Sequence, residues 1–214
     1  MPTVSVQSII TAASTVLQDI ENVRWTINEL VGWISDGQRD IAVIQPNACT
    51  INTDMQLVAG SKQHLPAGAR LLVDIPRNTN GRVIRIARRE LLDAQLPDWH
   101  LPARANAVTQ HYCYTEKDPK VFYVYPPSPG GNSVEIIYFA NPSDVQLWGT
   151  IGVDDVYKSA LIDYVLYRAL AKDAEYAQNF DQSKAYYASF MAFMTGKAGT
   201  EAAADPNRLT PSAI

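Results

Sequence analysis

The chain has 214 residues, of which 47% are hydrophobic and 19% are charged, with a formal net charge of −4. This length suits one globular domain with an inserted subdomain, and the mild acidity gives no electrostatic footprint for sequence-specific nucleic-acid binding. The two cysteines, Cys49 and Cys113, fit a reduced compartment without a disulfide framework. No signal peptide or run of 18 apolar residues is present, so we expect synthesis in the cytoplasm and no membrane association.

The sequence pattern of residues 1–46 predicts two helices. The first spans Ser5 to Gln18, where apolar residues recur at helical spacing. The second begins at Thr26, which forms a capping box with Glu29, and ends at Gln45–Pro46. The expected buried faces are Val6, Ile9, Ile10, Ala13 and Leu17 in the first helix, and Leu30, Trp33, Ile34, Ile41 and Ile44 in the second.

Residues 48–150 are rich in proline and glycine, and their apolar period falls from about 3.6 to 2, which predicts strands. A first hairpin is expected from Thr53 to Val58, with Gln63 to Leu65 pairing back. Arg70 to Ile75 reads as a strand or one helical turn, Asn78 to Gly81 as a turn, Arg82 to Ala87 as a strand and Arg88 to Leu96 as a short helix. An antiparallel meander is expected from Ala107 to Thr115, Val121 to Tyr125 and Ser133 to Ala140.

Residues 152–197 predict two consecutive amphipathic helices. A break is expected between Ala174 and Gln182, where Asn179 or Asp181 could cap the second helix, and Gly196 and Gly199 are expected to end it. The tyrosines of this helix pair indicate that it packs against other helices, either within the subunit or between subunits. Residues 198–214 bury little apolar surface and are expected to form a flexible or partner-docking tail.

The predicted fold class is therefore α+β. The N-terminal and C-terminal helix pairs, residues 1–46 and 152–197, form a helical bundle within a single domain of residues 1–214. The β-rich antiparallel insertion of residues 48–150 lies between these pairs in the sequence, and the extended C-terminal tail follows them.

No known catalytic or phosphate-binding motif occurs in the sequence. His111 and Cys113 would share one face of a strand, but two ligands are too few for structural zinc, so we favour ordinary strand residues. We expect no enzymatic activity, no metal and no cofactor.

Two features could contact a partner. The first is an arginine cluster, which suits a DNA backbone or an acidic protein surface; the alternative is a solvated turn salt-bridged by Asp74, Glu90 and Asp93. The second is Trp99 in the loop 97–100, which could anchor an interface or clamp the loop onto the sheet. The cluster consists of Arg77, Arg82, Arg85, Arg88 and Arg89.

A series of structural residues also runs in a fixed order along residues 25–195. They are Trp33, Asp36, Gln38, Arg39, Ile41 and Pro46; Gln63–Ala69, Arg77–Asn78 and Gly81; Leu91–Asp93 and Pro97–His100; Asp118–Pro119, Phe122–Pro127 and Val134–Ile136; and Tyr164–Tyr176, Ala185, Tyr186 and Phe190. In this order and spacing the chain resembles the head-to-tail adaptor (connector) proteins of tailed bacteriophages, especially short-tailed ones.

The resemblance implies a non-enzymatic virion protein at the head-to-tail interface, synthesised in the host bacterial cytoplasm. Such adaptors form a dodecameric ring below the portal protein, extend the DNA channel, and give the tail nozzle or tube a platform. Double-stranded DNA passes through the lumen without sequence-specific contacts. The resemblance also implies that the C-terminal segment docks on the portal, with Leu209, Pro211 and Ile214 as its candidate contacts.

Two alternatives come from other classes of protein. A monomeric helical protein-binding module would use the C-terminal helix pair, and would show an exposed groove and further helix-pair repeats. An uncharacterised hydrolase would need a pocket with a perturbed Asp or His, and the sequence offers none.

Overall fold

The computed structural model describes residues 2–173 and 177–204, and it confirms the mixed α+β class. The described part contains five α-helices and two sheets. The chain divides into two compact units: a helical unit, Met1–Cys49 with Pro142–Ile214, and a strand unit, Thr50–Asn141. No helix among the described residues is long and apolar enough to cross a membrane.

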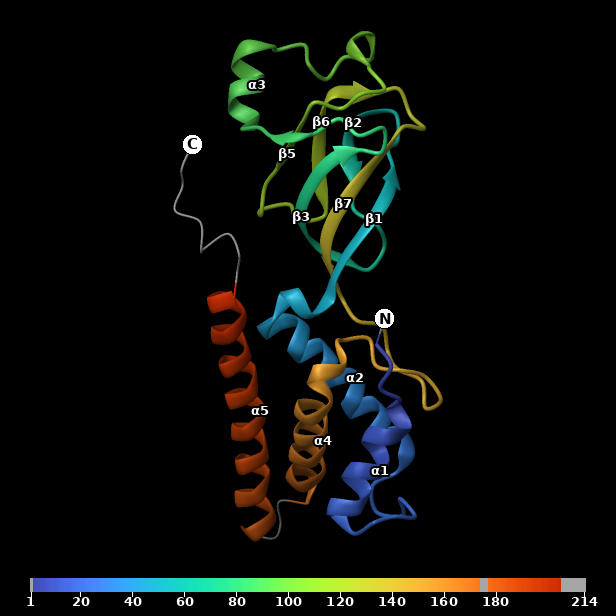
Figure 1. Cartoon of the computed structure of the whole chain (residues 1–214), viewed down its shortest axis with the longest axis vertical. Helices are drawn as coiled ribbons and strands as arrows, with labels where there is room; N and C mark the ends of the chain where they lie inside the picture. The colour runs from blue at the N-terminus through green and yellow to red at the C-terminus, as the bar shows by residue number, and fades with distance from the viewer. Residues whose placement is uncertain (1, 174–176, 205–214) are drawn as a thin grey trace. The chain divides into compact units, whose positions relative to one another are not determined.

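The helical unit contains four α-helices, with α4 placed between α5 and the α1–α2 pair (Figure 1). They are α1 (Val6–Leu17), α2 (Ile27–Ile44), α4 (Lys158–Lys172) and α5 (Ala177–Ala204); the short 3-10 helices η1 (Pro46–Cys49) and η3 (Asp155–Tyr157) accompany them. One hydrophobic core joins all four α-helices, with Ile9, Ile34, Leu161 and Phe190 at most 1% exposed.

Local chemistry explains where these helices begin. The Ser5 side chain accepts a hydrogen bond from the N–H of Ser8 at the start of α1, and Thr26 and Glu29 form the predicted capping box of α2. The predicted face of α1 is buried, apart from the half-buried Leu17.

In α2 the predicted face is correct at Leu30, Ile34 and Ile41, which are fully buried. Ile44 is 36% exposed, so its assignment to the core was wrong. It lies in the last turn before the predicted end at Gln45.

The strand unit contains two sheets, with strand orders β1-β7-β3 and β2-β6-β5-β4. The elements are β1 (Thr50–Gln56), β2 (Gly60–His64), β3 (Ala69–Asn78), β4 (Arg85–Ile86), α3 (Arg89–Gln95), the 3-10 helix η2 (Pro102–Arg104), β5 (His111–Tyr114), β6 (Val121–Ser128) and β7 (Ser133–Ala140). Leu57, Ile75, Phe122 and Ile136 belong to its core.

Two predicted strand pairings were wrong. The segment Gln63–Leu65 was expected to pair back on β1, but β2 pairs with β6 instead, and β1 pairs only with β7. The meander is correct for β5 and β6, which pair antiparallel, but not for β7. Both edges of β6 are occupied, by β2 and β5, so β7 joins the other sheet.

The C-terminal helix was predicted too short. Because α5 begins at Ala177, Asn179 and Asp181 lie inside the helix and are not caps. The helix also continues through Gly196 and Gly199 to Ala204, since glycine lowers helix stability by only about 1 kcal/mol and does not stop a helix. The first residues of the predicted tail, 198–204, are therefore helical, whereas Leu209, Pro211 and Ile214 lie outside the described residues.

Candidate partner-binding surfaces

The arginine cluster divides into two groups in the strand unit. Arg77 binds Glu135 across β3 and β7 at 2.5 Å, and Arg89 pairs with Asp93 at 3.4 Å while its guanidinium lies over the ring of Tyr123. These two arginines support the fold, as in the salt-bridged alternative.

The other three arginines are exposed and unpaired. Arg82, Arg85 and Arg88 form no ion pair with any residue that the structure describes. Asp74, expected among their partners, instead accepts hydrogen bonds from the hydroxyl of Tyr112 and from the N–H of Ile75.

Exposed apolar side chains alternate with these arginines along the same segment. Val83, Ile86 and Leu91 are 63%, 67% and 54% exposed. We call the six exposed residues 82, 83, 85, 86, 88 and 91 the arginine patch; Arg85 and Ile86 are neighbours in β4 and point to opposite sides of the sheet. Arginine mixed with apolar side chains is typical of protein interfaces, whereas a phosphate backbone offers no apolar surface for Val83, Ile86 and Leu91.

Trp99 is fully buried and holds the loop onto the sheet. Its Nε1–H donates to Asp93 Oδ1 at 2.8 Å, and its ring stacks on His100 at 3.7 Å and meets Tyr123 and Tyr125 edge-on. This position matches the clamping alternative, and the indole has no exposed surface to offer a partner.

A polar contact that the sequence did not suggest fixes the same loop. Ser61 Oγ in β2 and His100 Nδ1 share a hydrogen bond of 2.7 Å. Burial, helped by the positive charge of Arg89, lowers the pKa of His100 below its ordinary value, so the neutral ring is favoured at neutral pH.

His111 and Cys113 lie on β5, as predicted, and pack into the strand unit. His111 stacks on Tyr125, while Cys113 is buried beside Trp99, where burial raises the pKa of its thiol to about 11. Across the described residues, no three His, Cys, Asp or Glu side chains are placed to hold a metal ion.

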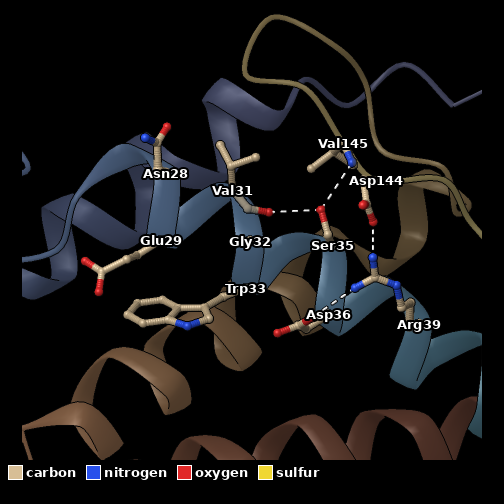
Figure 2. A pocket seen from close by; sticks show the side chains of 10 residues that line it. All are labelled: Asn28, Glu29, Val31, Gly32, Trp33, Ser35, Asp36, Arg39, Asp144 and Val145. Atoms are coloured by element: carbon tan, nitrogen blue, oxygen red, sulfur yellow. Dashed lines mark hydrogen bonds and ion pairs between the residues drawn. The ribbon is translucent and has the colours of Figure 1, made fainter.

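The helical unit carries a shallow, open groove of about 460 Å³ along α2 (Figure 2). The exposed backbone of Gly32 and the half-buried ring of Trp33 form part of it. Arg39 lies between the carboxylates of Asp36 and Asp144, and it binds both. The groove therefore combines an aromatic ring with charged groups already neutralised within the subunit.

The loop after Pro142, which contributes Asp144 and Val145 to this groove, also carries one large exposed apolar side chain. Trp148 is 85% exposed, although the loop around it is held firmly. Val145 is buried and its N–H donates to Ser35 Oγ, and the carbonyl of Gly149 accepts from the N–H of Val6 at 3.0 Å. An exposed tryptophan on an ordered turn is a good interface anchor, because its binding loses little conformational entropy.

The comparisons with known proteins concern the whole chain. A family described as SU10 adaptor protein matches residues 4–210, which include both units. A comparison with curated proteins finds no match.

Proposed function

We propose that this chain, which belongs to the SU10 adaptor protein family, forms a ring under the portal of a phage and connects the head to the tail. Membership makes it a structural adaptor of the virion and confirms the resemblance to phage head-to-tail adaptors. The match over residues 4–210 carries the proposal, because it includes nearly the whole chain rather than one motif.

In the proposed assembly, twelve copies extend the DNA channel and give the tail nozzle or tube its platform. Each subunit contacts its neighbours head to tail, so two different surfaces of the chain must be complementary. Trp148 and the α2 groove in the helical unit, and the arginine patch in the strand unit, are separate candidates for these surfaces. The lumen is expected to be polar or acidic, so that DNA slides without sequence-specific contacts, and the net charge of −4 is consistent with this.

The C-terminal segment is proposed to dock on the portal. The described helix α5 ends at Ala204, and the ten residues that follow include the apolar contacts Leu209, Pro211 and Ile214. Docking of this segment on the portal would couple binding of the subunit to assembly of the particle.

The deciding experiment images particles of the portal protein from the same genome, mixed with this protein. We expect a closed ring of added density on the portal, with the portal's symmetry. A folded protein that adds no density would contradict the adaptor ring and favour a monomeric protein-binding module.

A second sample tests the docking segment. Deletion of residues 205–214 is expected to leave a folded subunit that no longer binds the portal. Full binding by the truncated protein would contradict the docking role of Leu209, Pro211 and Ile214 while leaving the ring itself intact.

A further inference from the structure

Strand β1 forms an unprotected edge of its sheet. It pairs with β7 over seven residues without a register shift, and no strand among residues 2–173 and 177–204 lies on its other side. Six of its residues are exposed and Met55 is half-buried. Its sequence, TINTDMQ, contains no proline, lysine or arginine, and Asp54 is its one charged residue.

The hydrogen bonds around β7 show which backbone groups of β1 point outward. Ser133 uses its carbonyl to accept from Thr79 on the β3 side, and Ser133 lies opposite Gln56. The next residue, Leu57, donates to Asn132 at 2.8 Å. Because orientation alternates along a strand, Met55, Thr53 and Ile51 bond to β7, while Gln56, Asp54 and Asn52 direct their N–H and C=O groups to the open side.

The outward groups allow self-complementary antiparallel registers, and side-chain chemistry favours the one centred on Thr53. With Thr53 on a two-fold axis, Asn52 of each copy lies opposite Asp54 of the other, and Ile51 lies opposite Met55. Asn52 donates one amide hydrogen to Glu135 and has a second for the facing carboxylate. A register centred on Asp54 would instead place two carboxylates together, which is unfavourable.

We propose that two copies of this chain pair through β1 in this register and form one continuous six-stranded sheet, β3-β7-β1-β1-β7-β3. The contact buries two edges that each copy leaves open. A two-fold contact closes on itself, so it describes the free protein and goes beyond the ring of the assembled particle. It does not depend on the adaptor function and is measured without the portal.

The C-terminal segment of the chain is a poorer occupant of this edge. Pro206 and Pro211 are five residues apart. In an extended strand such residues point their backbone nitrogens to opposite sides, so one proline would face β1 without an N–H to donate.

Disulfide cross-linking tests both the pairing and its register. Thr53 would lie opposite Thr53 of the second copy as a non-hydrogen-bonded pair, with Cα atoms about 4.5 Å apart, close enough for a disulfide. The matched control is Gln56→Cys, whose two copies would be about 20 Å apart along the strands. Wild-type protein, whose cysteines are both buried, gives the background.

We expect Thr53→Cys to form a cross-linked dimer on mild oxidation of the full-length protein, and Gln56→Cys to stay monomeric. Equal cross-linking of the two variants, or none in a folded Thr53→Cys protein, would overturn the proposal.

A backbone change provides an independent test. Asp54→Pro removes an outward N–H without removing a bond to β7, and in the Thr53→Cys protein it should slow cross-linking at least about tenfold. Circular dichroism and thermal unfolding verify that this variant folds. Cross-linking at the original rate in the folded double variant would show that the open edge is not the contact.

A side-chain exchange tests the pairing chemistry. Asn52→Asp places two carboxylates opposite each other at both pairs and should weaken the dimer several-fold, as measured by analytical ultracentrifugation. The double variant Asn52→Asp, Asp54→Asn restores the amide–carboxylate pairs and should recover the dimer. A double variant no tighter than the single one would overturn the register.

Discussion

Gly37 of α2 faces the ring of Tyr164 of α4 so closely that a Cβ at position 37 would lie 2.9 Å from Cδ1 of Tyr164 and 3.1 Å from Cδ2 of Leu161. The two helices therefore approach each other at a point where only glycine fits. Burial of the Tyr164 side chain also raises the pKa of its hydroxyl to about 12.

Gly37→Ala tests this close approach. Overpacking against Tyr164 should cost about 1–3 kcal/mol, while the gain in helix propensity returns about 1 kcal/mol. The matched control is Gly32→Ala on the same helix, where a Cβ meets nothing within 4 Å and only the gain applies. Chemical unfolding should therefore show Gly37→Ala to be the less stable variant by about 1–3 kcal/mol; equal stabilities would contradict the contact.

Trp25→Phe tests which group hydrogen-bonds the carbonyl of Ala169 near the C-terminal end of α4. The indole Nε1–H donates to the carbonyl of Ala169 at 3.0 Å, while the N–H of Asp173 bonds to Leu170 instead. Loss of the indole donor leaves this carbonyl in the last helical turn without that partner, at a cost of about 1–3 kcal/mol in the free energy of unfolding. Trp148→Phe, at an exposed site, should change it by less than about 0.5 kcal/mol.

The ionisation of Asp19 makes the free energy of unfolding depend on pH in the acid range. Its carboxylate accepts hydrogen bonds from the N–H groups of Trp25, Val23 and Arg24, and these bonds, that of Trp25 foremost, lower its pKa in the folded state. The stabilisation is thus fully present above the pKa of the unfolded chain, about 3.9, and is lost as the pH falls through the lower folded value.

Unfolding curves measured from neutral pH down to this range should show a smaller pH-dependent loss for Asp19→Asn than for wild type. Glu21→Gln, which replaces an exposed carboxylate in the same loop, should keep the wild-type slope. An unchanged slope in Asp19→Asn would refute the role of this loop.

The role of the arginine patch in partner binding is tested by removing its three charges and, as a control, three other exposed positive charges of the strand unit. Replacement of Arg82, Arg85 and Arg88 by alanine should leave the fold unchanged, because the three side chains are exposed, but weaken assembly of the ring on the portal by about tenfold or more. The control replaces Lys62, Lys117 and Lys120, which are exposed cations of the same unit. Equal losses in binding would show that only net charge matters, as expected for DNA.

Elements stabilised by neighbouring residues could be predicted from the sequence. The capping box of Thr26 and Glu29 lies within four residues, and the period-2 pattern of Ser133–Ala140 matches β7 residue for residue. The order of strands could not be predicted, because it depends on which edges remain open after folding. Hence the pairing of β2 with β6 was missed.

The candidate surfaces also depend on contacts between residues far apart in the sequence, so they too could be predicted only in part. The exposed arginines were identified from composition, but their sequence spacing could not separate Arg77, which binds Glu135, from the unpaired Arg85. Trp148 was missed because an exposed and a buried tryptophan look alike in a sequence. Its exposure follows from contacts of the loop with Ser35 and Val6, which lie more than a hundred residues away.

The chain enters and leaves the strand unit at adjacent positions, because Thr50 pairs with Phe139 at the ends of β1 and β7. The Cα atoms of such a pair are about 5 Å apart, so a short turn of about two to five residues could close the helical unit if the strand unit were excised. The strand unit is therefore one contiguous segment, Thr50–Asn141, that begins and ends at neighbouring points of the fold. Such an arrangement lets the segment vary in sequence and length without changing the chain path of the four helices.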